Sequence, residues 1–152
     1  MNKTLIAVLG VIVLLAVVVW WSRSMQSSDP SIISRNGLHW HPILEVYVNG
    51  EKQEMPANLG LGPQYASNPT FDRQMGMAAV HTHDDASQGV VHLEFSGIVR
   101  EDDLTLKNFL DIWGKGINSF SSNVKMTVNG IENMELESYS MKDGDKIELR
   151  YE

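Results

Sequence analysis

Hydrophobic and polar positions divide the chain into one long apolar run and a series of short periodic stretches. Residues 4–21, TLIAVLGVIVLLAVVVWW, contain no charged side chain. As a helix rising about 1.5 Å per residue, this run reaches roughly 27 Å, close to the thickness of the hydrocarbon core of a bilayer. It has no polar face, which disfavours a core helix of a soluble domain. We therefore predict a single transmembrane anchor over residues 1–21.

Charges on the two sides of this run predict its orientation. Lys3 and the amino terminus precede it and Arg23 follows it, a small positive excess on the amino-terminal side. The positive-inside rule then places the N-terminus in the cytoplasm and the rest of this single-pass membrane protein in an extracytoplasmic position. A cleaved signal peptide is the alternative; it needs a shorter apolar run and an A-x-A-like site, and WWSRSMQSS offers only a poor one. Residues 22–36, rich in serine, are predicted to be a linker.

Several stretches beyond residue 37 alternate between apolar and polar positions, as β-strands do. Residues 43–55, ILEVYVNGEKQEM, place two β-prone runs around Asn49-Gly50, and residues 124–130, VKMTVNG, end at a second Asn-Gly pair. Asn-Gly is a preferred centre for a type I′ hairpin turn. Two further stretches complete the predicted strands: GVVHLEF, residues 89–95, and DGDKIELRYE, residues 143–152.

One stretch changes to helical spacing. Within residues 102–116, DDLTLKNFLDIWGKG, the apolar side chains follow the i, i+3, i+4, i+7 positions of one helix face: Leu106, Phe109, Leu110 and Trp113. Thr105 is placed to cap the N-terminus, and Gly114 can end the helix in the left-handed conformation. We predict a helix over residues 105–113, with Trp113 buried against a sheet.

The end of the chain resembles a known fold. Residues 124–152, VKMTVNGIENMELESYSMKDGDKIELRYE, combine a strand, an Asn-Gly turn, the connection ELESYSM and a DGD turn into a last strand. This order resembles the C-terminal half of a β-grasp domain, as in ubiquitin and the small sulfur-carrier proteins. The resemblance implies an α+β fold, a β-grasp-like mixed sheet with one packed helix over residues 37–152. The chain ends in LRYE and lacks the terminal Gly-Gly, so the resemblance does not extend to conjugation chemistry.

Composition excludes several kinds of function. The chain contains no cysteine, which rules out disulfides, thiolate metal sites and cysteine nucleophiles. Its formal net charge is −7, and all 19 acidic residues follow the apolar run. A domain that binds nucleic acid needs a basic face to neutralise phosphates, and none is visible. We therefore expect no nucleic-acid partner.

All five histidines lie in three short motifs, HWH at residues 39–41, HTH at residues 81–83 and HLE at residues 92–94. Residues i and i+2 of a strand point to the same face about 6.5–7 Å apart, so His39 with His41, and His92 with Glu94, can each approach one ion. The HTH motif is expected in a loop that precedes the strand of His92. Imidazole is a common ligand of zinc, copper, nickel and iron. In the strand that begins near His39, the apolar residues expected to face the core alternate with the histidines, so His39 and His41 lie on the opposite face. Pro42 can interrupt that strand. The predicted metal ligands are His39, His41, His81, His83, His92 and Glu94.

We expect the inner ligands to be His41, His81, His83 and His92. His39 and Glu94 come next. Histidines that line a polar sheet face and bond to loop carbonyls are the alternative. An extracytoplasmic site rich in histidine suits both copper and zinc. Copper is favoured because two methionines, Met75 and Met77, precede His81. A thioether is a soft ligand that favours Cu(I), although a pair of methionines more often fills a core.

The motifs together resemble a second group of proteins. HWHPILEVYVNG, MPANLG, HTHD, VVHLEF and FLDIWG, spread over residues 37–152, are similar to uncharacterised membrane-anchored bacterial and archaeal proteins. This resemblance implies no reaction.

Three functions stay open on the sequence alone. The first is a membrane-tethered extracytoplasmic metal-binding module that carries or delivers copper or zinc. The second is a small metal-dependent enzyme, a hydrolase with zinc or an oxidoreductase with copper, in which Glu45, Asp84 or Asp85 could be the base. The third is a metal-free domain that binds another membrane protein. The chain has no G-x-S-x-G, phosphate-binding or H-E-x-x-H motif.

The stretch EMPANLGLGPQYASNPTFDRQMGM, residues 54–77, shows no periodicity and is rich in Gly, Pro and Asn. A loop of this length in a small domain is usually functional or disordered. We predict that it folds over the histidine site as a lid.

Overall fold

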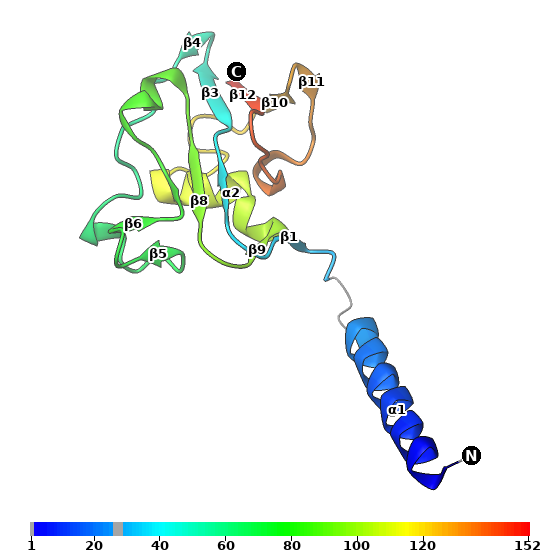
Figure 1. Ribbon diagram of the computed structural model, residues 1–152. Coiled ribbons are helices and arrows are strands. Elements are labelled where there is room, and N and C mark those ends of the chain that lie inside the picture. Colours follow the sequence, from blue (N-terminus) through cyan, green and yellow to red (C-terminus); the bar gives the residue numbers. More distant parts are fainter. Residues whose placement is uncertain (1, 26–28) are drawn as a thin grey trace. The chain divides into compact units, whose positions relative to one another are not determined.

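The chain divides into two compact units, Met1–Pro30 and Ser31–Glu152, in a computed structural model that describes residues 2–25 and 29–152 (Figure 1). The first unit contains helix α1, Lys3–Met25. Its segment Lys3–Arg23 is long and apolar enough to cross a membrane. The helix continues past the end of the predicted anchor, so the first residues of the predicted linker are helical.

The largest sheet of the second unit has five strands in the order β11-β10-β12-β3-β4. The C-terminal strand β12 lies between β10, which is antiparallel to it, and β3, which is parallel to it (Figure 1). The strand that begins at Val124 thus pairs with the terminal strand. The strand bounds are β3 Ile43–Val48, β4 Glu51–Lys52, β10 Val124–Val128, β11 Ile131–Glu132 and β12 Lys146–Tyr151.

Both Asn-Gly pairs form the predicted hairpin turns. Asn49 has φ 51° and Gly50 has φ 84°, and they join β3 to β4; Asn129 has φ 53° and Gly130 has φ 80°, and they join β10 to β11. Positive φ at both central residues is the requirement of a type I′ turn. The two turns therefore set the register of their strands locally.

Helix α2, Leu106–Trp113, supplies one side of the hydrophobic core. Leu106 and Phe109 are completely buried and Leu110 nearly so, as the spacing predicts. Gly114 ends the helix in the left-handed conformation, with φ 69° and ψ 27°. Trp113 is only half-buried, and its ring lies 5.9 Å from that of Phe109, so the prediction of a buried Trp113 is wrong in degree. It lies on the last turn, where the helix leaves the core.

A smaller sheet of three strands has the order β2-β8-β7, with β2 Leu38–Trp40, β7 Val80–His81 and β8 His92–Phe95. The strand expected to run from residue 39 onward is broken at Pro42, which cannot donate a backbone hydrogen bond to a sheet. As a result, β2 and β3 belong to different sheets. The HTH motif, expected in a loop, begins at the end of β7.

Two further pairs of short strands complete the unit. Strand β1, Ile32–Ser34, lies within the residues predicted as linker and pairs with β9, Val99–Arg100. Strands β5, Phe71–Asp72, and β6, Met77–Ala78, pair within the long Gly- and Pro-rich segment. The 3-10 helices are η1 Pro63–Tyr65, η2 Asp84–Gln88, η3 Glu101–Leu104 and η4 Leu136–Ser138.

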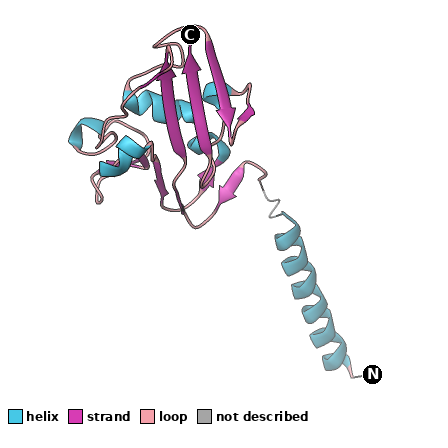
Figure 2. Cartoon of the chain, turned by 90° about the horizontal axis from the view of Figure 1, so that it is seen from above, coloured by secondary structure: helices cyan, strands magenta, loops and turns pink. Residues whose placement is uncertain are grey.

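The second unit is therefore an α+β structure with mixed pairing, as the sequence predicts (Figure 2). In the described residues, α1 and α2 are the two α-helices of the chain. Buried side chains of the large sheet, of α2 and of β7 and β8 form one continuous core, with Leu149, Phe109 and Leu93 all 0% exposed. The small sheet is thereby held on the same rigid core as the large one.

Candidate metal centre

The register of the small sheet brings the histidine motifs together. His39 is opposite Glu94 in the β2–β8 pair, and His81 is opposite His92 in the β7–β8 pair. Paired residues point to the same face of a sheet, and so do residues two apart on one strand. These four side chains therefore share one face. The alternate residues turn to the core, where Leu93 is 0% exposed.

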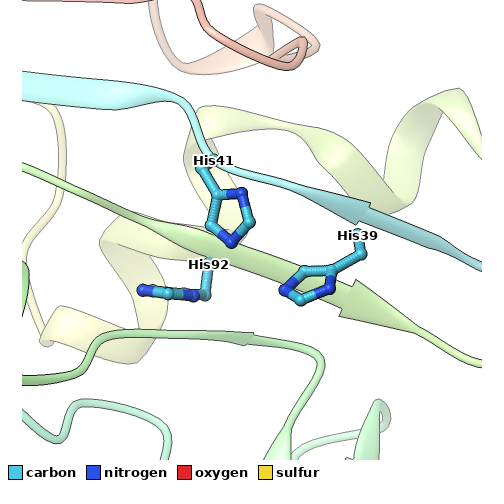
Figure 3. A group of neighbouring side chains, drawn as sticks. All are labelled: His39, His41 and His92. Atoms are coloured by element: carbon cyan, nitrogen blue, oxygen red, sulfur yellow. The ribbon is translucent and has the colours of Figure 1, made fainter.

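The five imidazole rings form one connected group with His92 at its centre. The His92 ring centroid lies 4.8 Å from that of His41, 4.6 Å from that of His83 and 5.4 Å from that of His81. His39 joins the group through His41, at 4.6 Å. Figure 3 shows His39, on β2, and His41, just after the end of β2, pointing toward His92. The group contains two sets of three ring nitrogens within 4.8 Å of one another, each of which could hold a metal ion.

The first set, which we name the inner triad, consists of His81, His83 and His92. Nε2 of His81 lies 3.1 Å from Nε2 of His83. Two nitrogens bound to one tetrahedral ion at 2.0–2.1 Å are about 3.3 Å apart, from the angle between them. The two imidazoles are therefore already spaced as a pair of ligands, with His92 beside them.

His81 is held in the tautomer that a metal requires. Its Nδ1 lies 2.9 Å from the carbonyl oxygen of Ala78, so Nδ1 carries the proton and donates it there. Nε2 of His81 then has a free lone pair, and Nε2 of His83 donates the hydrogen bond between the two rings. Burial lowers the pKa of His81 from its usual 6.5 to about 4, against the opposing effect of the hydrogen bond to Ala78. The side chain is therefore neutral near pH 7 and ready to coordinate.

The second set, the outer triad, consists of His39, His41 and His92. The His39 side chain is 60% exposed, and its Nε2 pairs with Oε1 of Glu94 at 2.7 Å. The backbone N–H of His41 donates to Oδ1 of Asp143 at 2.8 Å, which fixes the chain just after β2. Glu94 belongs to neither triad, and its contact in the structure is with a ligand candidate, His39.

Asp85 is a functional candidate that the predicted ligand set omits. Both of its carboxylate oxygens lie 3.1 Å from Nε2 of His92. A carboxylate that accepts the proton of one ring nitrogen directs the lone pair of the other toward a metal. Asp85 is the second residue of η2, which directly follows the HTH motif. The sequence therefore shows that Asp85 is close to His83 along the chain, but it does not show the contact with β8.

The contact with Asp85 engages Nε2 of His92 and leaves the other ring nitrogen, Nδ1, to be considered. Among the side chains that the structure describes, it is the buried nitrogen or oxygen left without a hydrogen-bond partner. An unsatisfied buried polar group costs about 1–3 kcal/mol, so such atoms in proteins call for an explanation. A metal ion bound at Nδ1 satisfies it.

The long Gly- and Pro-rich segment packs against the residues that carry the inner triad. The Thr82 hydroxyl donates to the carbonyl oxygen of Pro56 at 2.8 Å and accepts from the backbone N–H of Leu59 at 3.0 Å. Gly60 has φ 78°, and a Cβ there would lie 2.7 Å from the Val80 carbonyl oxygen and 2.9 Å from Cβ of His81. Only glycine allows this close approach of backbone to the buried histidine.

A groove of about 470 Å³ adjoins the outer triad. His39 and Glu94 form part of its wall, and the long segment contributes Met75, Met77 and Asp72. Met75 is 56% exposed, so it is available to solutes and does not fill the core. The segment predicted to be a lid therefore lines a groove beside His39 and supports His81 from behind.

The site could hold a metal ion through three imidazoles in either of two sets. Imidazole binds copper and zinc alike, so the nitrogen ligands do not distinguish between them. Comparisons of this chain with models of protein families, with curated proteins and with solved structures give no match.

Proposed function

We propose that this protein is a membrane-tethered metal-binding module that carries or delivers a transition metal ion, with copper favoured over zinc. The observation that carries the proposal is the buried, unpartnered Nδ1 of His92 at the centre of four other imidazoles. A buried nitrogen without a hydrogen-bond partner, close to other imidazoles, is an arrangement that suits a metal site.

The inner triad is the resident site in this proposal. His81 is 0% exposed and His92 is largely enclosed, with 12% of its side chain accessible. Both are oriented by acceptors, the Ala78 carbonyl oxygen and the Asp85 carboxylate, and such orientation strengthens metal binding. His83 completes the set and is partly exposed. Three protein ligands leave a position for water, or for a ligand supplied by an acceptor of the metal.

Copper is favoured by the methionines of the adjoining groove. Met75 and Met77 line it together with His39, and thioether sulfur is a soft ligand that selects Cu(I) over zinc. The predicted extracytoplasmic position, with the N-terminus in the cytoplasm, supports the same choice. Helix α1, long and apolar enough to span a bilayer, provides the tether.

A β-grasp-like scaffold fits this role. The parallel pairing of β3 with β12, the antiparallel β10 beside it and the single packed helix α2 support that relationship. A scaffold of this kind keeps the ligands on short strands of a rigid core, and such preorganisation favours binding.

A small metal-dependent enzyme is the second candidate, favoured by the groove of about 470 Å³ beside His39 and Glu94. Its volume lies within the range of small-molecule sites. A metal-free domain that binds another membrane protein is the third candidate. The gathering of all five rings argues against it, since that function would not require them to converge.

Titration calorimetry of the full chain in detergent with Cu(II) and Zn(II), followed by elemental analysis, tests the proposal. We expect tight binding to the wild-type protein. The His81→Asn, His83→Ala double variant should bind at least about tenfold more weakly. The asparagine amide can still donate to the Ala78 carbonyl oxygen, so this variant keeps the local fold while losing Nε2. Equal affinity in both proteins, or no binding to the wild type, would contradict the proposal.

A further inference from the structure

The two triads share one residue, and this suggests how an ion reaches the inner one. We propose that the outer triad of His39, His41 and His92 receives the ion from solution and passes it to the inner triad of His81, His83 and His92, with His92 bound throughout. The protein then holds one ion at a time in two alternative positions. This inference rests on the proposed metal-binding function and deepens it.

Exclusive occupancy follows from the contacts of His92. Its Nε2 is engaged by both oxygens of Asp85 at 3.1 Å, so only Nδ1 has a lone pair to offer. A neutral imidazole with one proton offers one lone pair to a metal. His92 therefore completes one triad at a time. An ion in either triad leaves the other with two histidines, fewer than the three or four protein ligands of typical zinc sites.

The direction of transfer follows from exposure. His39 is the most accessible ligand, with 60% of its side chain exposed, whereas His81 is completely buried. In this scheme the ion binds the most accessible imidazole, His39, first and the buried His81 last. The acidic side chains beside the outer triad, Asp72, Glu94 and Asp103, favour the approach of a cation along the groove.

Glu94 regulates the first step in this scheme. It holds Nε2 of His39 at 2.7 Å, so the approaching ion must replace this contact. Because Glu94 lies opposite His39 in the β2–β8 register, the displaced carboxylate stays close to the ion. Its negative charge then compensates the positive charge that has entered the outer triad.

Transfer proceeds by ligand exchange, without oxidation or reduction. The ion loses water as it binds His39, His41 and Nδ1 of His92. It then gains Nε2 of His83 and Nε2 of His81 while the bonds to His39 and His41 break. The proton on Nε2 of His39 passes through solvent to Nδ1 of the same ring when the ion binds and returns when the ion leaves. The proton on Nε2 of His83 likewise passes to Nδ1 of its own ring, so charge and protons balance. The 3.1 Å spacing of the His81 and His83 nitrogens means that the final pair of ligands needs little rearrangement.

Stopped-flow kinetics on the full chain in detergent test the transfer, with Cu(II) delivered to and withdrawn from the protein by a competing chromogenic chelator. In the His39→Ala, His41→Ala double variant we expect the binding and release rates to fall together by about tenfold, with affinity unchanged within about threefold. Binding and release use the same route through the outer triad, so removing that route slows both rates by the same factor. Glu148→Gln is the matched control, because Glu148 lies on β12, contacts Arg150 and belongs to neither triad, so both rates should stay at the wild-type values.

Calorimetry gives the second readout, a stoichiometry of one Cu(II) per chain in the wild type and in the His39→Ala, His41→Ala variant. Two ions bound together would overturn exclusive occupancy. Unchanged rates in the double variant would overturn the outer route, and a loss of affinity with an unchanged association rate would make His39 and His41 ligands of the resident ion. No Cu(II) binding to the wild type would instead remove the proposed function itself.

Discussion

Asp85 holds His92 by its Nε2, at 3.1 Å from both carboxylate oxygens, and this contact leaves Nδ1 of the same ring buried without a partner. The two residues are brought together by η2 and β8, and the contact fixes which nitrogen of His92 can bind a metal. A residue outside both triads therefore orients the histidine that the two triads share.

Replacing Asp85 with asparagine should weaken metal binding by about 10–100-fold, the usual effect of losing a residue that orients a ligand. The amide lacks the negative charge that keeps the proton on Nε2 of His92. Calorimetric titration with Cu(II) measures the effect. Asp84→Asn is the matched control, because Asp84 is the exposed neighbour in η2 and should leave the affinity unchanged. Equal affinities in the two variants would show that the Asp85 contact has no influence on the metal.

Gly60→Ala should reduce both stability and metal affinity, because the added Cβ would collide with the Val80 carbonyl oxygen and with Cβ of His81. Gly76→Ala is the control for backbone strain. Gly76 also has a positive φ, 71°, but nothing lies within 4 Å of a Cβ placed there. Urea unfolding of residues 31–152 and Cu(II) titration together test this pair. Equal losses in the two variants would mean that φ alone is responsible and that the approach to His81 is unimportant.

The metal-free protein should become less stable as the pH falls from about 6.5 to about 4. Burial lowers the pKa of His81 to about 4, so between these values the unfolded chain takes up a proton that the folded chain does not. Above this window the residue is neutral in both states and contributes nothing. The loss is about 3 kcal/mol at most, the free energy of the full pKa shift.

Urea unfolding across this pH range measures the effect, and His81→Asn is the control. Asparagine can donate to Ala78 but does not titrate, so its pH profile should be flatter. Identical slopes in the two proteins would assign the pH dependence to other groups.

Phe109→Ala should destabilise the second unit by about 3–5 kcal/mol, as expected for a buried aromatic side chain. Phe109 is completely buried, whereas Trp113 is half-buried at the end of α2. Trp113→Ala should therefore cost clearly less than Phe109→Ala. Denaturant unfolding monitored by circular dichroism compares the two, and the reverse order would contradict the packing of α2 described above.

The apolar helix should remain part of the mature protein. Lys3–Arg23 is long and apolar enough to span a membrane, and the sequence that follows offers a poor cleavage site. Intact mass of the protein from the membrane fraction should include residues 1–21. A soluble chain that starts near residue 24 would show instead that the segment is a cleaved signal sequence.

Local sequence determined the elements whose physics is local. An uncharged run predicts α1, two Asn-Gly pairs predict the hairpins after β3 and β10, and the spacing from Leu106 predicts α2, with Gly114 as its end. Each depends on side chains within a few residues of one another, so the pattern in the chain already contains the cause. The confinement of the histidines to three motifs likewise indicated a candidate metal centre before any fold was known.

Tertiary structure decided which of these elements meet. The parallel pairing of β3 with β12 and the register that places His39 opposite Glu94 join segments far apart in the chain. Such pairings depend on the packing of a whole core, which no short window of sequence records.

The roles of Asp85 and Gly60 appear for the same reason only in the folded chain. Asp85 is one of two adjacent acids in the sequence, and only the return of β8 beside η2 distinguishes it from Asp84. Gly60 is one glycine among 12, and only its contact with His81 gives its missing side chain a function. The chemical type of a side chain is known from the sequence. Its hydrogen-bond partners and its burial, which set its pKa and decide whether a polar atom is left without a partner, are determined by packing.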